Sequence, residues 1–496
     1  DMANILGLRN FIRSNTIEKL LVTYGNDIGV FDNVTTFAGQ GRNLSINLTM
    51  EFDVFLDYLI GVNGTDKNQV YDGTSWFDGG ARTRMPIGNV VKTVGNKVYI
   101  ANLTYAGINF RSRVWLSDLP KNDDITWGYE TGTNLVQTAL SRVVTSVNAG
   151  FLTYNIKTGD PFFITTGTNL GQYTVDTIDS DFQITLVEAM KNTATGSTYW
   201  VGSNWIDARR NDGDTVKGLG ENDNKLLVFK RESLHRYDER ELRRVKGAPG
   251  TTSHRSIVNV RENTFYFHDT GVIRYDGITT FIISRPIQDW IDGIDSVFYP
   301  NIVGWRDGDI LYMFVGNLSN SSKGISLTNA VLIYDTAAQA WDIGQLSHAI
   351  RVAHETTVSG VRTIYLGTTN DKILKWNDGT ADISSPIPWA FATVFHFPNG
   401  VFNVSEFDKV EVHTIDGRGI SLYYKLYGTN KVDTNWRPLG DINDDVTTFD
   451  FPRGTFGRGI AFKFQENSTR SPTVLGRIDI FTKDREARNL PNVTNQ

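Results

Sequence analysis

Three histidines, His235, His254 and His268, come nearest to the pattern of a metal site, because imidazole nitrogen is a common zinc ligand. They fall on successive predicted strands, and the chain has no His-x-His or His-Glu-x-x-His motif. Cysteine is absent, which excludes thiolate ligands, disulfides and a cysteine nucleophile. We therefore expect no metal centre and no cofactor.

Two acidic stretches, 212–214 and 441–445, offer hard oxygen ligands of the kind that calcium prefers. Neither has the loop of alternating ligands closed by a glutamate, so solvated turns explain them equally well. A Gly-x-Ser-x-Gly nucleophile elbow is also missing. No catalytic residue is expected, and the chain is interpreted as a non-enzyme.

A more regular set of carboxylates recurs along the chain, each close behind an aromatic or apolar residue and commonly followed by Gly. A ring of such carboxylates could bind a metal or perform acid–base chemistry, but each Asp could also cap its own turn, which is the interpretation we favour. Gly73 and Gly277 would supply the positive φ that such a turn needs. The marker acids are Asp32, Asp72, Asp118, Asp238, Asp276, Asp335 and Asp378.

The elements around these acids are seven loose repeats: an apolar strand, a short gap, the aromatic-Asp turn and a second apolar strand. Several repeats lie about 40–50 residues apart, which is typical of four-stranded propeller blades. The composition agrees, with 28 Phe, 19 Tyr and 11 Trp suited to strands and 46 Gly suited to turns. The sequence predicts an all-β fold built on a seven-bladed β-propeller, within a range of six to eight blades.

Two segments interrupt or follow the repeats. Short alternating strands punctuated by glycine predict a small β-barrel inserted at 140–205, and the end of the repeat pattern predicts a C-terminal β-sandwich at 385–483. The propeller then occupies 1–139 and 206–384, and an extended tail is expected at 484–496.

The densest charge cluster, KRESLHRYDERELRRVK, is a candidate contact between subunits. It mixes both signs, so a solvated blade edge is an equally good interpretation, and it is a poor nucleic-acid patch. The basic residues concerned are Arg231, Arg236, Arg240, Arg243 and Arg244.

The net charge of −6 argues against tight DNA binding, although a weakly acidic wall would let DNA slide past without adhering. No run of eighteen apolar residues occurs, so no membrane span is expected. The N-terminus does not have the pattern of a signal peptide, which favours synthesis and retention in a cytosol.

Two stretches resemble the propellers of short-tailed bacteriophage tail proteins, including packaged-DNA stabilisation factors and tail nozzles. The first, 222–290, contains NDNKLLVFKRESLHRYD, GAPGTTSHRSIVNV and FYFHDTGVIRYDGITTFIISRPIQDWI, with Ile-Ser-x-Pro-Ile at 283–287 leading into a short helix. The second, RGIAFKFQENSTRSPTVLGRIDIF at 458–481, is similar to sandwich strands that follow such propellers. The inserted barrel departs from the family pattern.

This resemblance implies a structural protein of the virion tail, assembled in the host bacterial cytoplasm. Copies would form a ring, a hexamer by the resemblance, below the portal and adaptor complex. The ring would line part of the DNA exit channel, pass genomic DNA non-specifically, and dock tail fibre or tip proteins. Rings of identical chains need heterologous interfaces that close.

The alternative is a propeller that binds or cleaves host glycan, since exposed aromatic side chains stack on sugars. Recurrence of the tryptophans at similar places in the repeat instead favours packing between blades. An exposed cluster beside a carboxylate pair would favour the glycan hypothesis. The tryptophans concerned are Trp76, Trp115, Trp305, Trp341 and Trp376.

Overall fold

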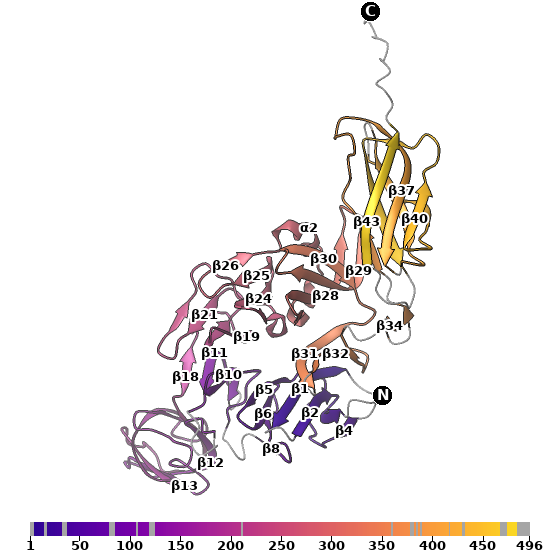
Figure 1. Ribbon diagram of the computed structural model, residues 1–496. Coiled ribbons are helices and arrows are strands. Elements are labelled where there is room, and N and C mark those ends of the chain that lie inside the picture. The colour runs from indigo at the N-terminus through magenta and orange to yellow at the C-terminus, as the bar shows by residue number, and fades with distance from the viewer. Residues whose placement is uncertain are drawn as a thin grey trace, which may run out of the picture. The chain divides into compact units, whose positions relative to one another are not determined.

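The computed structural model describes residues 4–13, 17–31, 37–78, 85–105, 108–118, 125–209, 212–358, 361–376, 381–382, 385–386, 389–415, 417–428, 432–466 and 474–483. The chain forms two compact units, residues 1–376 and 377–496 (Figure 1). The regular secondary structure of the described residues is almost entirely β-strand, as the sequence predicts, and the longest α-helix among them has four residues. None of the described helices is long and apolar enough to cross a membrane.

The first unit contains small antiparallel sheets built from consecutive strands. The first three are β1 (Ile5–Arg13), β2 (Ile17–Tyr24), β3 (Asp27–Phe31) and β4 (Phe37–Gly39); β5 (Glu51–Phe55), β6 (Tyr58–Val62), β7 (Gln69–Tyr71) and β8 (Trp76–Asp78); and β9 (Val90–Val94), β10 (Lys97–Tyr105), β11 (Ile108–Leu116) and β18 (Trp205–Asp207). Polar turns separate these short, apolar strands, which favours antiparallel neighbours along the chain.

Four more sheets follow in the same unit. They are β19 (Gly218–Asn222), β20 (Lys225–Phe229), β21 (Leu234–Tyr237) and β22 (Leu242–Arg244); β23 (Val258–Val260), β24 (Asn263–His268), β25 (Gly271–Tyr275) and β26 (Thr280–Ile282); β27 (Val303–Asp307), β28 (Ile310–Asn320), β29 (Ile325–Asp335) and β30 (Ala340–Gln345); and β31 (Ile350–Val358), β32 (Val361–Thr368) and β33 (Ile373–Lys375). The last sheet has three strands among the described residues.

The sheets form a ring, with the first strand of each next to the cavity at its centre. β1 contacts β5, β5 contacts β9, and β9 contacts β19, while β23 contacts β27, β27 contacts β31, and β31 contacts β1. The contact between β31 and β1 brings the two ends of the unit together. This arrangement is propeller-like.

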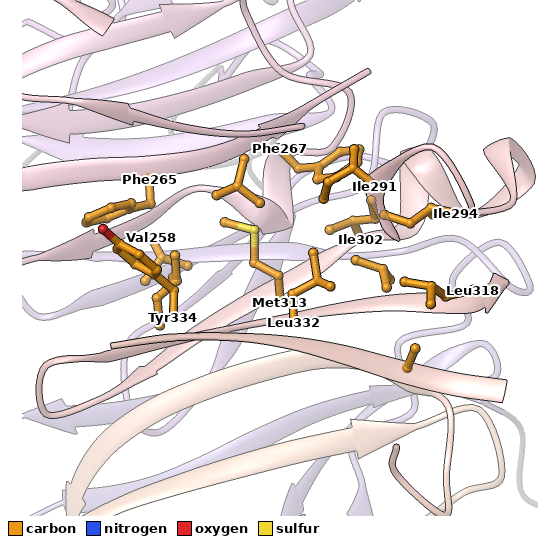
Figure 2. Packing of buried hydrophobic residues seen from close by; sticks show 14 of the residues in the cluster. Val258, Phe265, Phe267, Ile291, Ile294, Ile302, Met313, Leu318, Leu332 and Tyr334 are labelled. Carbon is orange, nitrogen blue, oxygen red and sulfur yellow. The ribbon is translucent and has the colours of Figure 1, made fainter. Parts of the chain in front are cut away.

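Apolar side chains fill the layers between successive sheets. In Figure 2, Phe265 and Phe267 of β24 face Met313 of β28 and Leu332 of β29. Met313 and Leu332 are completely buried, because the strands that carry them are covered on both sides. Burial of such side chains contributes about 2 kcal/mol each, so these layers are the main source of stability of the ring.

Four marker acids cap their own turns. Asp276 Oδ1 accepts hydrogen bonds from the amides of Ile278 and Thr279 at 2.9 and 2.8 Å. The carboxylates of Asp72, Asp238 and Asp335 accept from amides two and three residues further along in the same way. These bonds support the structural interpretation of the repeat.

In three of these four turns the residue after the capping Asp has a left-handed backbone. Gly73 has a φ of 94° and Gly277 one of 95°, whereas Glu239 occupies the equivalent place with a φ of 71°. The preceding tyrosine hydroxyl donates to this residue's carbonyl, at 2.7 Å from Tyr275 to Gly277. Marker acids Asp32 and Asp378 lie outside the described residues.

Asp118 has a different role from the other markers. Its carboxylate accepts from Thr126 at 3.0 Å, Asn155 at 3.1 Å and Asn204 at 2.7 Å, and lies 3.4 Å from the Lys157 ammonium. These partners lie where the chain enters the inserted barrel, within it and where it leaves. Asp118 therefore ties the barrel to the third sheet instead of capping a blade turn.

The inserted domain is a closed six-stranded barrel between β11 and β18. Its strands, in barrel order, are β12 (Tyr129–Gln137), β13 (Val143–Ser146), β16 (Gln183–Leu186), β15 (Gly171–Ser180), β14 (Pro161–Ile164) and β17 (Ala194–Gly202). The barrel begins at Tyr129, earlier than the predicted boundary at 140. The polar sequence Thr-Gly-Thr-Asn in β12 gives no strand signal, although this strand pairs with β17.

The described part of the second unit contains the short pair β34 (Ala381–Asp382) and β35 (Ser385–Pro386) and two larger sheets whose inner faces share one core. One sheet has the order β36-β42-β38-β39, and in the other β37 pairs with β40, β41 and β43. The strands are β36 (Trp389–Ala392), β37 (Ser405–Ile415), β38 (Ser421–Tyr427), β39 (Arg437–Asp441), β40 (Val446–Asp450), β41 (Phe456–Gly457), β42 (Gly459–Glu466) and β43 (Val474–Lys483). Val410, Val412, Phe462 and Phe464 are completely buried between the sheets. The predicted tail, 484–496, lies outside the described residues.

Candidate functional site: the central cavity

All seven sheets of the first unit contribute residues to a central cavity of about 460 Å³. Each first strand lies next to the cavity along one edge and pairs with the second strand of its sheet along the other. The cavity is the place where side chains from the whole length of the unit meet.

One residue from each first strand forms what we call the charge belt. Following the ring, its charges run positive, negative, positive, negative, neutral, positive and negative. The belt therefore carries three positive and three negative charges. Its members are Arg9, Asp53, Lys92, Glu221, Asn259, Arg306 and Glu355.

Neighbouring members of the belt are paired. Arg9 Nη2 lies 2.6 Å from Asp53 Oδ1, and Lys92 Nζ lies 3.8 Å from Asp53 Oδ2. The same Lys92 ammonium is 3.9 Å from Glu221. Asp53 is nearly buried, so these cations compensate a charge that would otherwise be costly to desolvate. The pairs join the first four sheets at the centre.

Glu355 pairs across the last two sheets. It accepts from Arg306 Nε at 2.9 Å and from Arg362 Nε at 2.8 Å. Burial alone would raise the pKa of Glu355, but the hydrogen bonds from the two guanidinium groups outweigh it and hold the pKa below its usual value. Glu355 is therefore ionised at neutral pH, which suits an ion pair and not a general acid.

Arg255 crosses the ring near the belt. It lies in the short 3-10 helix His254–Ser256 that precedes β23. Its Nε donates to Glu51 at 2.7 Å, its Nη1 to the Arg351 carbonyl at 2.7 Å, and its Nη2 to the Leu6 carbonyl at 2.7 Å. One side chain thus connects the fifth sheet to the first, second and seventh.

Two histidines beside these groups are held neutral. Burial, and then the charge of Arg9, lower the pKa of His354 well below its ordinary value. Burial is also the main cause that lowers the pKa of His254, although Glu51 opposes it. The cavity carboxylates Glu51, Asp53, Glu221 and Glu355 each have a cation within 4.0 Å. Because these cations are already paired, the arrangement joins the sheets and does not favour binding of an anionic ligand.

The structure separates the three candidate metal-binding histidines. His235 contacts Ser233 at 3.1 Å, His268 contacts Thr270 at 3.0 Å, and His254 lies 3.8 Å from Glu51. Within the described part of the chain, none of them joins a group of three ligating side chains.

The acidic stretch 212–214 is satisfied by the protein itself. The Asp212 carboxylate lies 2.5 Å from the fully buried ammonium of Lys230. Asp214 accepts from the amides of Arg231 and Glu232, at 3.2 and 2.9 Å. In the other stretch, Asp441 accepts from Ser421 at 2.7 Å. Asp212 and Asp214 therefore stabilise loops, whereas Asp441 joins β39 to β38.

The arginine cluster is partly used within the chain. Arg231 pairs with Asp269, Arg236 donates to the Gly277 carbonyl at 2.8 Å, and Arg243 pairs with Glu241 at 2.9 Å. Arg240 and Arg244 are exposed on the same outer edge. Arg236, Arg243 and Arg244 also line a surface groove of about 420 Å³, next to the strongly exposed Ile278.

The tryptophans proposed for glycan stacking pack inside or between sheets. Trp115 is completely buried and Trp305 is 3% exposed. Trp76 stacks on Tyr71 at 4.7 Å between ring centroids, and Trp376 packs edge-on against Trp305 at 5.3 Å. Trp341 donates to the Ile283 carbonyl at 3.0 Å. These positions favour a packing role.

Sequence reasoning did not identify the charge belt or the bridging role of Arg255. The available signal was a charged residue inside six of the seven first strands, such as Asp53 in EFDVF and Glu221 in GLGEN. Charged residues are almost never deeply buried unless they are paired, so their recurrence at this place predicts a paired network.

Neither a family model nor a curated protein matches the sequence. Solved structures similar to the chain include the computationally designed protein Ika8, with 8% identity, a TM-score of 0.35, and coverage of 75% of this chain and 96% of that one. Streptogramin B lyase has 11% identity, a TM-score of 0.34 and coverage of 76% and 96%. The phage phi92 endosialidase has 11% identity, a TM-score of 0.21 and coverage of 99% and 71%. At these TM-scores the likenesses carry no argument.

Proposed function

We propose that the first unit is a seven-bladed β-propeller and that the protein is a structural component of a phage tail, arranged side by side in a ring of copies. The blade count is supported by the seven sheets that share one central cavity. The paired charges of the belt line that cavity, and its volume of about 460 Å³ leaves no room for duplex DNA, so DNA would pass between propellers and not through them.

The observation that carries a ring-forming role is the surface of the inserted barrel. A solvated domain rarely exposes many large apolar side chains close together, and such patches mark interaction sites. Those that are at least 50% exposed are Leu140, Val147, Leu152, Leu170, Phe182 and Val187. Backbone hydrogen bonds from Ser146 to Phe182 and from Phe151 to Asp181 bring three of them to the same end of the barrel.

A complementary surface exists on the same chain. Residues 129–202, the barrel, carry six acidic and three basic side chains, a net charge of −3. Residues 225–246, around the basic groove, carry eight basic and four acidic ones, a net charge of +4. The barrel of one copy would therefore dock on the basic groove and Ile278 of the next, which is the heterologous contact that a closed ring requires.

Electron cryo-microscopy of the intact particle, with its proteins identified by mass spectrometry, tests the tail assignment. We expect a ring of these chains beneath the portal and adaptor, in contact with fibre or tip proteins. A chain that is strictly monomeric when purified and absent from mature particles contradicts the proposal.

The interface is tested separately by native mass spectrometry of purified variants. Reversing Arg240, Arg243 and Arg244 to Glu should weaken self-association, and adding Asp179→Lys and Asp181→Lys in the barrel should restore it. Arg453→Glu, an exposed change in the second unit, is the control that should have no effect. Loss of association without rescue by the barrel changes would refute this pairing of surfaces.

A further inference from the structure

The second unit has a cluster of possible metal ligands on the outer face of a sheet. Glu411 and His413 are two residues apart on β37, so they project from the same face. Val410 and Val412 project from the other face and are completely buried in the core. Asp479 of β43 is the cross-strand partner of Glu411, which places its side chain beside the other two.

The three ligand atoms already have the spacing of a coordination shell. His413 Nε2 lies 3.1 Å from Glu411 Oε1 and 3.3 Å from Asp479 Oδ2. All three atoms lie within 4.8 Å of one another. Bonds of about 2.0–2.2 Å to a tetrahedral ion place neighbouring ligand atoms about 3.4 Å apart, so little rearrangement is needed to admit one.

The environment of the imidazole favours a cation. His413 Nε2 is buried and makes no hydrogen bond of acceptable geometry, although two carboxylate oxygens face it. An unprotonated nitrogen and two carboxylates repel one another through their lone pairs unless a positive charge lies between them. An imidazolium proton can serve only one oxygen well, whereas a metal ion is shared by all three.

A neighbouring arginine fixes one of the carboxylates. Arg477 Nε donates to Asp479 Oδ1 at 2.7 Å, which leaves Oδ2 directed at His413. Such outer contacts commonly orient metal ligands. All three ligand residues are half-buried, so the fourth position of a tetrahedral ion would be open to water.

We propose that Glu411, His413 and Asp479 bind a divalent transition-metal ion. One imidazole and two carboxylates suit zinc and similar ions, whereas magnesium and calcium prefer sites made only of oxygen. The ion joins β37 to β43, the last described strand of the chain, and stabilises that end of the sheet. This inference is independent of the proposed tail function.

Isothermal titration calorimetry of the full chain with ZnCl₂, after treatment with a chelator, tests the site. We expect one zinc ion per chain, and titration with Co²⁺ should give the visible absorption of a tetrahedral complex. His413→Ala and the near-isosteric Asp479→Asn should each weaken zinc binding at least ~10-fold, as expected for the loss of a ligand. His396→Ala, an exposed histidine of the same unit, should bind zinc as the wild type does.

The variants also separate the site from a simple ion pair. If the wild type binds no zinc, or if Asp479→Asn keeps the wild-type affinity and stoichiometry, the proposal is wrong and the cluster is only an imidazolium–carboxylate pair. An affinity for MgCl₂ equal to that for ZnCl₂ would also overturn it, because magnesium prefers oxygen ligands and gains little from the imidazole. Such a result would indicate an unselective acidic surface. Circular dichroism of Asp479→Asn confirms that any loss of binding occurs in a folded chain.

Discussion

Replacement of Arg255 by Met is the sharpest test of how the ring of sheets is held closed. Methionine keeps much of the apolar stem but removes the hydrogen bonds to Glu51, Leu6 and Arg351. The Arg255 and Glu51 side chains are 11% and 19% exposed, so water replaces little of what is lost. Removing one partner of a buried ion pair costs about 3–5 kcal/mol, and a buried carbonyl left without its donor costs about 1 kcal/mol or more.

We therefore expect Arg255→Met to lower the free energy of unfolding of the first unit by about 3–5 kcal/mol, a large part of the ~5–15 kcal/mol typical of folded proteins. Urea unfolding followed by tryptophan fluorescence reports this unit well, because only Trp389 and Trp436 of the eleven tryptophans lie in the second unit. A double-mutant cycle with Glu51→Gln isolates the ion pair from the two carbonyl contacts.

The matched control is Arg261→Met. Arg261 also pairs with a carboxylate, that of Asp309, but the two side chains are 61% and 44% exposed. An exposed pair contributes about 1 kcal/mol or less. If Arg255→Met is no more destabilising than Arg261→Met, the contacts of Arg255 do not close the ring, and apolar packing between the sheets suffices.

The remaining predictions concern pH and the repeated turns. Burial, assisted by Lys230 and Arg244, lowers the pKa of His235 to about 4, below its unfolded value of about 6.5. The neutral imidazole therefore stabilises the fold fully above about pH 6.5, and this stability is lost as the pH falls toward 4. Replacing His235 by Gln should flatten this loss, which amounts to about 3 kcal/mol for the group, in urea titrations between pH 7 and 4.5; an unchanged slope would show that His235 does not titrate there. Asp276→Ala removes the acceptor of two amide hydrogen bonds and should lower the free energy of unfolding by about 1–2 kcal/mol. Asp276→Asn keeps an acceptor oxygen and should lower it less. Equal losses of stability in the two variants would refute the capping role. Glu239→Gly should stabilise the first unit by about 0.5–1 kcal/mol, because Glu239 has a φ of 71° that glycine adopts without strain, and a lower urea midpoint would contradict this.

The β-rich architecture was predictable because its signals are local. The Tyr-Asp-Gly turn at 275–277 is set by residues next to one another: the Asp caps the turn, the Gly takes the positive φ, and the Tyr hydroxyl bonds to the Gly carbonyl. The barrel boundary at Tyr129 was missed because most residues in the first half of β12 are polar. Assignment of this half as a strand depends on its partners in β17, which are 67 to 73 residues further along the sequence.

The central cavity and the metal ligands were not predictable because their partners are distant in sequence. Arg255 contacts Glu51 and Leu6, which lie 204 and 249 residues earlier in the chain, and no local pattern indicates those contacts. His413 gives a local signal with Glu411, two residues earlier on the same strand. The third member, Asp479, depends on the register between β37 and β43, which sequence reasoning on single strands does not provide.

The closure of the ring explains why charged residues are concentrated at its centre. The first sheet takes its strands from Ile5–Gly39 and the last from Ile350–Lys375, so no described sheet contains strands from both ends of the unit. Side chains must therefore supply the bonds between the first and last sheets that a strand shared by both would provide. Leu8 and Val352 pack across the junction, Asn10 donates to Thr356, and Arg255 binds carbonyls on both sides of it. Apolar contacts alone would tolerate sliding of one sheet over the next, whereas these directional bonds define a single register. The proposed ring of copies would need such a fixed register for every barrel to meet its neighbour at the same angle.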